Sequence, residues 1–244
     1  MLSNLKSEDS ANIANEKDSV GGGTVLESAL YPVIITMAYL NKSSGGALGL
    51  VLTVKTEDDQ EVRQTLWMTS GTAKGGKNYY EKDGVKNYLP GYLQANALTL
   101  LSIGKEISDM ETETKVLNIY SPEAKAEVPT KVEVLMDLLN KPVLIGMLKQ
   151  TVDKTTKNEA TGAYDATGET KEENEIDKIF RASDRMTTAE IRAKAESATF
   201  ADTWIAKWTG KTRNKAKGVA VGGVAGRPPV GKAASTKPSA SLFA

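Results

Sequence analysis

Three runs of β-branched and apolar residues in the first third of the chain constrain the fold most. The runs are 30–40 (LYPVIITMAYL), 47–56 (ALGLVLTVKT) and 61–70 (EVRQTLWMTS), and turn-forming residues separate them. In the third run Val62, Leu66 and Met68 alternate with more polar neighbours, as in a strand with one buried face. The pattern predicts an antiparallel meander, with Trp67 on the outward face of its third strand.

A helix is predicted directly after the meander and the glycine-rich stretch that follows it. Leu93, Ala97, Leu100 and Leu101 recur at helical spacing within Leu89–Lys105. Gly104 is placed to end this helix, because glycine commonly follows the last helical turn.

Further strands and helices are predicted in the second half of the chain. A capping box of Thr187 and Glu190 predicts the start of a helix over 187–197. The segment 156–175 is polar and contains glycine, and we expect a solvated loop between two pairing strands or an insertion without fixed structure. The remaining expectations are a helix over 199–211 and strands over 115–121, 130–139, 141–155 and 176–184, with 135–139 fitting either a strand end or a helical turn.

The predicted element order favours a mainly β protein with helical additions, of the α+β class. A meander of five or more strands with a helix between strands 3 and 4 is the order of an OB-fold, an antiparallel barrel often used to bind oligonucleotides. We expect this OB-fold-like domain over 28–204, with the polar insertion 156–175. Residues 1–27 are expected to form a flexible arm, and 205–244 a disordered basic tail.

Charge is divided unequally along the chain, although the 31 basic and 31 acidic residues balance overall. Eight of the basic residues follow residue 204, and no acidic residue follows Asp202. Residues 1–204 therefore carry 23 basic residues against all 31 acidic ones. A basic, glycine- and alanine-rich tail cannot bury a core, but it attracts phosphates in a salt-dependent way.

The composition excludes several kinds of active site. The chain has neither cysteine nor histidine, which removes disulfides, thiolate metal sites, the usual zinc sites and histidine-based catalysis. An acidic cluster at 109–113 fits a solvated loop better than a Mg²⁺ site, because no second acidic cluster matches it. No targeting signal or apolar run long enough to span a membrane is visible. We therefore expect a non-enzymatic protein without metal or cofactor.

The stretch 70–92 (SGTAKGGKNYYEKDGVKNYLPGY) has the spacing of a phosphate-binding loop, with Gly71 followed by Gly76 and Lys77. Such a loop needs Ser or Thr after the lysine and then a helix. Here Asn78 follows, and the Asp83-Gly84 pair predicts a tight β-hairpin turn instead. Nucleotide triphosphate hydrolysis is therefore disfavoured.

The same stretch combines aromatic and basic residues. Five of the chain's 14 aromatic residues lie within 67–92, interleaved with lysines. Single-strand binders combine cations for phosphates with aromatic rings on which bases stack. The residues also suit a hairpin whose tyrosines only cover the edge of the core, Tyr79 and Tyr92 first among them. Residue chemistry alone leaves both interpretations open.

The run Leu66–Glu106 resembles the single-stranded DNA-binding proteins of tailed bacteriophages. The similar features are the Gly-Lys-x-Tyr-Tyr segment, the Leu-Pro-Gly-Tyr step and the helix after it. Lys141–Lys154, Thr187–Trp204 and a basic linker closing on Ser-Leu-Phe also look like that family. The resemblance implies an OB-fold that binds single strands without sequence preference during replication, recombination or repair. It also implies the cytoplasm of an infected bacterium.

We therefore expect a viral single-stranded DNA-binding protein, with RNA left open as a ligand. The expected DNA-binding residues are Arg63, Trp67, Lys74, Lys77, Tyr79, Tyr80, Lys82, Lys86 and Tyr88. The expected phosphate contacts of the tail are Lys211, Arg213, Lys215 and Lys217. Many single-strand binders carry an acidic tail that recruits replication proteins, whereas this tail is basic. Leu242 and Phe243 are nevertheless expected to dock on a protein partner.

Two other functions fit the sequence. The first is a virion structural or adaptor protein that uses the tyrosine-rich hairpin as a protein interface, since tyrosine is enriched at such interfaces. The second is a Mg²⁺-dependent nuclease or nucleotide-hydrolysing enzyme.

Overall fold

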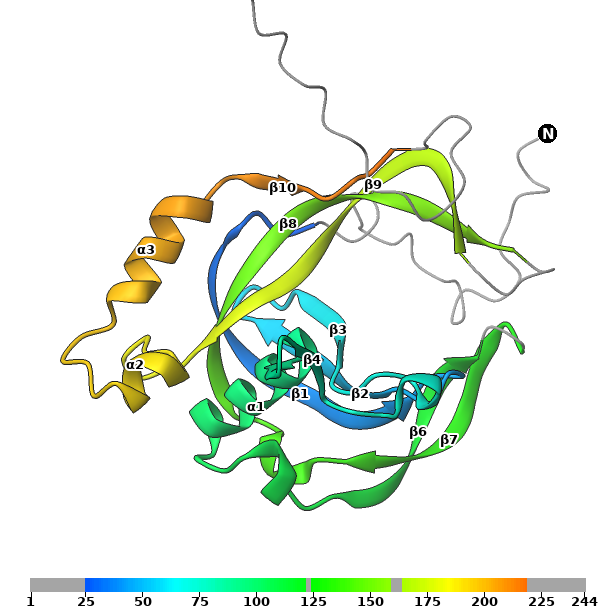
Figure 1. Ribbon diagram of the computed structural model, residues 1–244, viewed down its shortest axis with the longest axis horizontal. Coiled ribbons are helices and arrows are strands. Elements are labelled where there is room, and N and C mark those ends of the chain that lie inside the picture. Colours follow the sequence, from blue (N-terminus) through cyan, green and yellow to red (C-terminus); the bar gives the residue numbers. More distant parts are fainter. Residues whose placement is uncertain (1–24, 122–123, 159–163, 219–244) are drawn as a thin grey trace, which may run out of the picture. The chain divides into compact units, whose positions relative to one another are not determined.

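The computed structural model of the protein describes residues 25–121, 124–158 and 164–218 (Figure 1). The described residues divide into two compact units. The larger unit contains the described residues up to 150 together with 172–213, and the smaller contains 151–171 and the described residues from 214 onward.

The larger unit is built mainly from antiparallel strands. The strands are β1 (Ala29–Lys42), β2 (Leu48–Thr56), β3 (Glu61–Trp67), β4 (Tyr79–Lys82), β5 (Val85–Tyr88), β6 (Glu113–Ser121), β7 (Ala126–Val134), β8 (Pro142–Lys157), β9 (Tyr164–Phe180) and β10 (Thr212–Asn214), of which β8, β9 and β10 continue into the smaller unit. The helices are α1 (Pro90–Ser102), α2 (Thr188–Arg192) and α3 (Thr199–Trp208). The expected mainly β, α+β class is thus confirmed.

Strand β1 organises the main sheet, because three strands pair with different parts of it. It pairs with β2 from Val33 to Lys42, with β8 from Ala29 to Ile34, and with β7 at Tyr39 and Leu40. Strands β2 and β3 pair in turn, which confirms the predicted meander. Apolar side chains of this meander form one side of the main core.

The core lies between the meander and helix α1. Ala95, Leu98 and Leu101 of α1 are buried against residues such as Leu52 and Leu66 of the meander. The predicted helix is confirmed, and Gly104 ends it with a positive φ of 84° while its N–H donates to the carbonyls of Thr99 and Leu100. The predicted inward face is displaced, because Leu93 is exposed while Ala95 and Leu98 point inward.

No closed barrel forms among the described residues, so the expected OB-fold closure is not established. At the position where β9 approaches β3, side chains replace a strand ladder. Gln64 on β3 accepts a hydrogen bond from the Ile176 N–H (2.7 Å), and the Gln94 amide on α1 donates to the Ile176 carbonyl (2.8 Å). Two glutamines therefore satisfy the backbone of a β9 residue that is fully buried.

Two smaller apolar clusters cover other faces of the larger unit. The β6–β7 hairpin packs Leu117 and Ile119 around Tyr39 of β1. Helix α3 packs Trp204 against Phe180. A Cβ at Gly146 of β8 would lie 2.9 Å from the Trp204 ring, so only glycine allows this approach.

Two predicted segments differ from the structure. Residues 164–175, expected within a loop or insertion, belong to strand β9. Nearly all residues of its first half are exposed on both faces, so no apolar alternation marks the strand. The expected tail from residue 205 instead begins with the end of α3 and strand β10, which pairs with β8.

Two further predictions agree more closely with the structure. Residues 136–138 form a 3₁₀ turn, which is the helical alternative for 135–139. Helix α2 begins with the predicted capping box of Thr187 and Glu190 but ends after five residues.

The smaller unit joins the ends of β8 and β9 to the residues after β10. The Lys154 ammonium lies 2.9 Å from the Glu169 carboxylate. The backbone N–H groups of Lys215 and Lys217 donate to the Thr151 carbonyl and the Asp153 carboxylate.

Candidate nucleic-acid interface

The β4–β5 hairpin presents two chemically different faces. Asp83 and Gly84 both have positive φ, 53° and 75°, which is the backbone of the tight turn that Asp-Gly predicted. Residues directly opposite in an antiparallel pair share a face, so the register assigns each side chain. One face carries Tyr79, Glu81, Lys86 and Tyr88, and the other carries Tyr80, Lys82, Val85 and Asn87.

The first face holds a set of contacts that we call the tyrosine cluster: Tyr79, Tyr88, Tyr92, Lys77 and Lys86. The rings of Tyr79 and Tyr88 meet edge to face at 6.1 Å, and Tyr88 stacks on Tyr92 at 5.3 Å. The ammonium groups of Lys77 and Lys86 lie 5.4 and 4.8 Å from the centre of the Tyr79 ring, within cation–π range. Burial is the main cause that raises the pKa of Tyr92, which packs against the core as expected.

The opposite face is more exposed. Tyr80 is 53% exposed and Val85 is 62% exposed. Lys82 shares this face. The sequence-predicted residues Tyr79 and Tyr80 are therefore adjacent in the chain but point to opposite sides of the hairpin, so one strand lying on a single face would not contact both.

Trp67 is held outward by two close glycine contacts. A Cβ at Gly49 would lie 2.8 Å from the Trp67 ring, so the indole rests directly on the β2 backbone. A Cβ at Gly91 would lie 2.2 Å from the Trp67 carbonyl oxygen, so the start of α1 crosses closely over the end of β3. The ring remains 42% exposed, as the meander pattern predicted.

Arg63 lies on the same face of β3 as Trp67, four residues or roughly 13 Å away. Its guanidinium donates a hydrogen bond to the Tyr39 hydroxyl and lies 5.9 Å from the centre of that ring. The contact with Tyr39 holds the Arg63 guanidinium in place but does not neutralise its positive charge.

Lys74 lies in the 3₁₀ turn Thr72–Lys74, before two glycines with positive φ, Gly75 and Gly76. The chain then enters β4, so the glycine-lysine pair is followed by a strand and not by the helix of a phosphate-binding loop.

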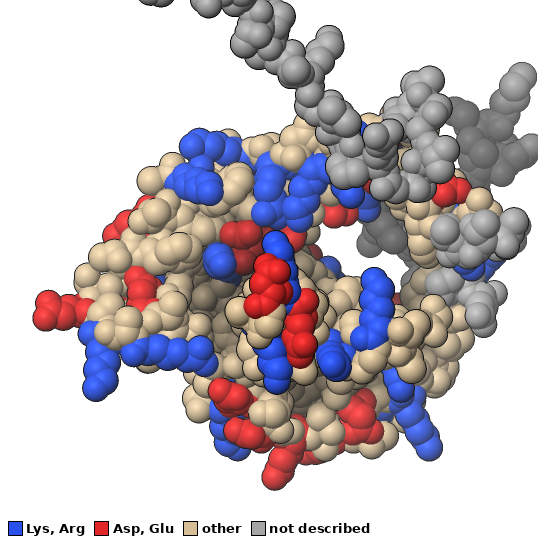
Figure 2. All heavy atoms as spheres, viewed as in Figure 1, with Lys and Arg blue, Asp and Glu red and all other residues tan. Residues whose placement is uncertain are grey.

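The hairpin lysines make no ion pair with a carboxylate in the part of the chain that the structure describes. These lysines are Lys74, Lys77, Lys82 and Lys86. Figure 2 shows acidic side chains among the basic ones over the hairpin, which carries Glu81 and Asp83. The lysine charges are thus available to a ligand, although the local net charge is lower than the lysines alone indicate.

The tail residues are arranged differently. The Arg213 guanidinium forms ion pairs with Glu175 and with Asp177 (3.3 Å), and it also donates to the Gln150 side chain. The same Asp177 accepts a hydrogen bond from the Trp204 indole N–H at 2.8 Å. We call this group the Arg213 cluster. Its charge is neutralised within the protein, so the expected phosphate contact at Arg213 would require breaking these pairs.

The other expected phosphate contacts of the tail, Lys211, Lys215 and Lys217, are exposed. Leu242 and Phe243 lie outside the described residues.

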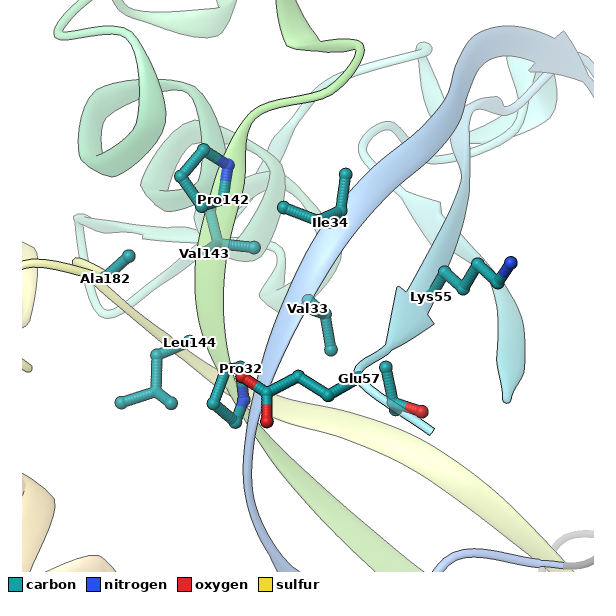
Figure 3. Close-up of a pocket in the computed structure, with 10 residues that line it drawn as sticks. Pro32, Val33, Ile34, Lys55, Glu57, Pro142, Val143, Leu144 and Ala182 are labelled. Atoms are coloured by element: carbon teal, nitrogen blue, oxygen red, sulfur yellow. The ribbon is translucent and has the colours of Figure 1, made fainter. Parts of the chain in front are cut away.

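Two cavities lie in the larger unit. The first has a volume of about 270 Å³ and is lined by residues such as Pro32, Val143 and Glu57 (Figure 3). Its only basic residue, Lys55, forms an ion pair with Asp59 at 2.7 Å. The second has a volume of about 410 Å³ and lies beside Tyr79, Lys77 and Tyr92. Only the second cavity adjoins the tyrosine cluster.

The structure also adds exposed residues that the sequence did not single out. Val116 and Tyr120 project from the outer face of β6, opposite to the partly buried Leu117 and Ile119. Strict alternation in this strand is the signal that identifies its outward residues.

Within the described ranges, no cluster of three or more acidic side chains is placed to hold a metal ion. The described helices include none that is long and apolar enough to cross a membrane. Neither the protein-family models nor the curated proteins contain a match to this chain.

Proposed function

We propose that this protein binds single-stranded DNA without sequence preference. The observation that carries the proposal is the combination of exposed aromatic rings with four lysines that have no carboxylate partner among the described residues. Lys82 and Lys86 lie on the β4–β5 hairpin, and Lys74 and Lys77 lie in the glycine-containing segment before it. Such a surface offers stacking platforms and phosphate contacts together, and neither requires a particular base.

The geometry divides the aromatic residues by role. Trp67, Tyr80 and Tyr88 expose enough ring area for bases to stack on them. The Tyr79 ring instead has two ammonium groups close to it, so it positions Lys77 and Lys86 and leaves them at the edge of the cluster. Stacking is therefore assigned to Trp67 and to either Tyr80 or Tyr88, which lie on opposite hairpin faces, and phosphate contacts to the lysines and Arg63.

The sheet arrangement is compatible with an OB-fold, which is the finer fold assignment that we propose. Two features support it: a long first strand shared by several partners, and a helix between β3 and β6, the third and fourth strands of the main sheet. The glutamine bridges lie where β9 would pair with β3 in a closed barrel. With this fold we propose a role in phage DNA replication, recombination or repair in an infected bacterial cytoplasm. Replication or recombination proteins would be partners of Leu242 and Phe243.

The test is a titration of fluorescently labelled oligo-dT with the full chain at two salt concentrations. Affinity is expected to fall as salt rises, with a logarithmic slope of roughly 0.7 for each phosphate neutralised on a single strand. Lys86→Ala should lower that slope by about one such contact, whereas Lys55→Ala, whose lysine is paired with Asp59, should leave it unchanged. Absence of binding at low salt would refute the proposal.

A second candidate function is supported by the exposed Tyr80 and Val85 on one hairpin face. An aromatic and an aliphatic side chain together suit a protein interface, as in a virion structural or adaptor protein. A double change of Tyr79 and Tyr80 to alanine separates the two functions. It should weaken oligonucleotide binding if DNA is the ligand, and abolish only partner capture if the hairpin binds protein.

A further inference from the structure

The 410 Å³ cavity beside the tyrosine cluster is built from both apolar and polar residues. It is lined by residues of β1, β2, the segment 68–79, α1 and the segment 107–112, and by Leu135. We infer that this cavity receives one nucleobase of the bound strand, an inference that rests on the proposed function. Its volume lies within the roughly 300–1,000 Å³ of typical small-ligand sites.

The apolar walls suit a flat aromatic ligand. Met68 and Leu135 are buried at the cavity, and Met110 and Ile107 are partly buried there. Methionine sulfur makes favourable contacts with aromatic rings, and its flexible side chain adapts to ligands of different shape. A site with these walls would accept purines and pyrimidines alike, as binding without sequence preference requires.

Most polar groups at the cavity are already used. The Thr69 hydroxyl accepts from the Leu48 N–H, and the Thr112 hydroxyl donates to Glu133. The carboxamide of Asn78, which is half-buried, makes no hydrogen bond with the described part of the chain. A carboxamide offers a donor and an acceptor side by side, which is the pairing that base edges require. Asn78 is thus the group best placed to hydrogen-bond an inserted base.

The entrance fits a sugar-phosphate backbone. A Cβ built on Gly76 meets no atom within 4 Å, so the space above this glycine is open. Lys77 lies at the same edge and has no carboxylate partner among the described residues. A strand can therefore pass over Gly76, place a phosphate near Lys77 and turn one base inward between Tyr79 and the methionines. An apolar side chain of a protein partner could also fill the cavity, but it would not pair with the positive charge of Lys77.

Methionine methyl resonances provide a direct test, because a stacked base displaces the resonances of nearby protons. The full chain, labelled with ¹³C at the methionine methyl groups, is titrated with oligo-dT and with an abasic oligonucleotide of the same length. The resonances of Met68 and Met110 are expected to move with oligo-dT and to remain in place with the abasic strand. Met37 and Met147 do not line the cavity, so they serve as internal references.

A pair of asparagine variants tests the hydrogen bond. Asn78→Ala should weaken oligo-dT binding roughly two- to tenfold, the usual value of one hydrogen bond. Asn118→Ala is the control, because Asn118 is exposed on β6 and does not line the cavity. Binding by the Asn118 variant should be unchanged.

The outcomes distinguish this inference from the proposed function. If oligo-dT binds but the Met68 and Met110 resonances stay fixed, the inserted base is refuted and the DNA-binding proposal stands. Equal responses to oligo-dT and the abasic strand also refute insertion. If no oligonucleotide binds, both ideas fail together.

Discussion

Two regions of the molecule combine aromatic and basic side chains, and their surroundings make them chemically opposite. In the tyrosine cluster, Lys77 and Lys86 contact a tyrosine ring and no described carboxylate. In the Arg213 cluster, Glu175 and Asp177 pair with the arginine, and Trp204 is only 3% exposed. The composition of the two regions is similar, but only the first leaves charge and ring area for a ligand.

The difference shows that carboxylates distant in sequence decide the role of a cation. Glu175 and Asp177 precede Arg213 by more than thirty residues and reach it only because β9 and β10 both pair with β8. Glu81 lies opposite Lys86 in the hairpin register, but among the described residues no carboxylate forms an ion pair with a hairpin lysine. Mutations in the Arg213 cluster should therefore change stability, and those in the hairpin should change binding.

The largest effect is expected for Trp204→Ala. Removing a buried tryptophan that packs on Phe180 and Gly146 should lower the free energy of unfolding by about 3–5 kcal/mol. Urea unfolding followed by circular dichroism measures this loss. The matched control is Trp67→Ala, because Trp67 is half-exposed, and it should cost much less stability while weakening oligo-dT binding. An equal loss of stability for both variants would remove the distinction between the two regions.

The next effect concerns the exposed tyrosines. Tyr80 and Tyr88 lie on opposite hairpin faces, so a strand that follows one face should lose about 1–3 kcal/mol of binding free energy with only one of the variants Tyr80→Ala and Tyr88→Ala. Tyr120→Ala is the control, because Tyr120 is at least as exposed but lies on β6, outside the hairpin. Fluorescence anisotropy measures the three affinities. A loss confined to either Tyr80 or Tyr88 would identify the hairpin face that the strand follows.

The sequence predicted the central part of the fold because its signals are local. Alternation in β3, the Asp83-Gly84 turn and the capping box at Thr187 each depend on neighbouring residues only. Strand β9 was missed because its first half is exposed on both faces and shows no apolar period. The absence of a closed barrel could not be predicted for a related reason. In place of β3–β9 pairing, Gln64 and Gln94 form hydrogen bonds with the Ile176 backbone, and these residues are far apart in the sequence.

The candidate site was predictable in composition but not in geometry. The sequence identified the lysines and tyrosines near the hairpin. The structure was needed to show that Tyr79 and Tyr80 are neighbours within strand β4 and therefore point to opposite faces. The sequence also could not indicate Asn78 as a cavity residue, because the cavity walls come from six separate parts of the chain.

A smaller effect on stability is expected for Arg213→Ala. The variant leaves Glu175 and Asp177 without their cation, which should cost about 1–2 kcal/mol, since these carboxylates are partly shielded from water. Oligo-dT affinity should be unchanged, because the charge of Arg213 is already paired with these carboxylates. Reduced affinity with unchanged stability would instead support the phosphate contact that the sequence predicted for Arg213.

The smallest effect concerns pH and the helices beside the Arg213 cluster. Burial alone would raise the pKa of Glu190, but hydrogen bonds from the backbone N–H groups of Phe200 and Thr187 and from the Thr187 hydroxyl outweigh it and lower that pKa below its ordinary value of 4.5. A carboxyl with a lowered folded-state pKa stabilises the fold above its unfolded-state pKa, and this contribution is lost as pH falls through the folded-state value.

Wild-type stability should therefore decline below about pH 4.5, and Glu190→Gln should decline less steeply because glutamine keeps the capping hydrogen bonds without titrating. Thermal unfolding from neutral to acidic pH measures both profiles. Asp184→Asn is the comparison variant. The pKa of Asp184 is also lowered, first by its hydrogen bond with Arg181, but this ion pair lies outside the capping box. Identical profiles for wild type and Glu190→Gln would show that the capping box does not couple α2 and α3 to pH.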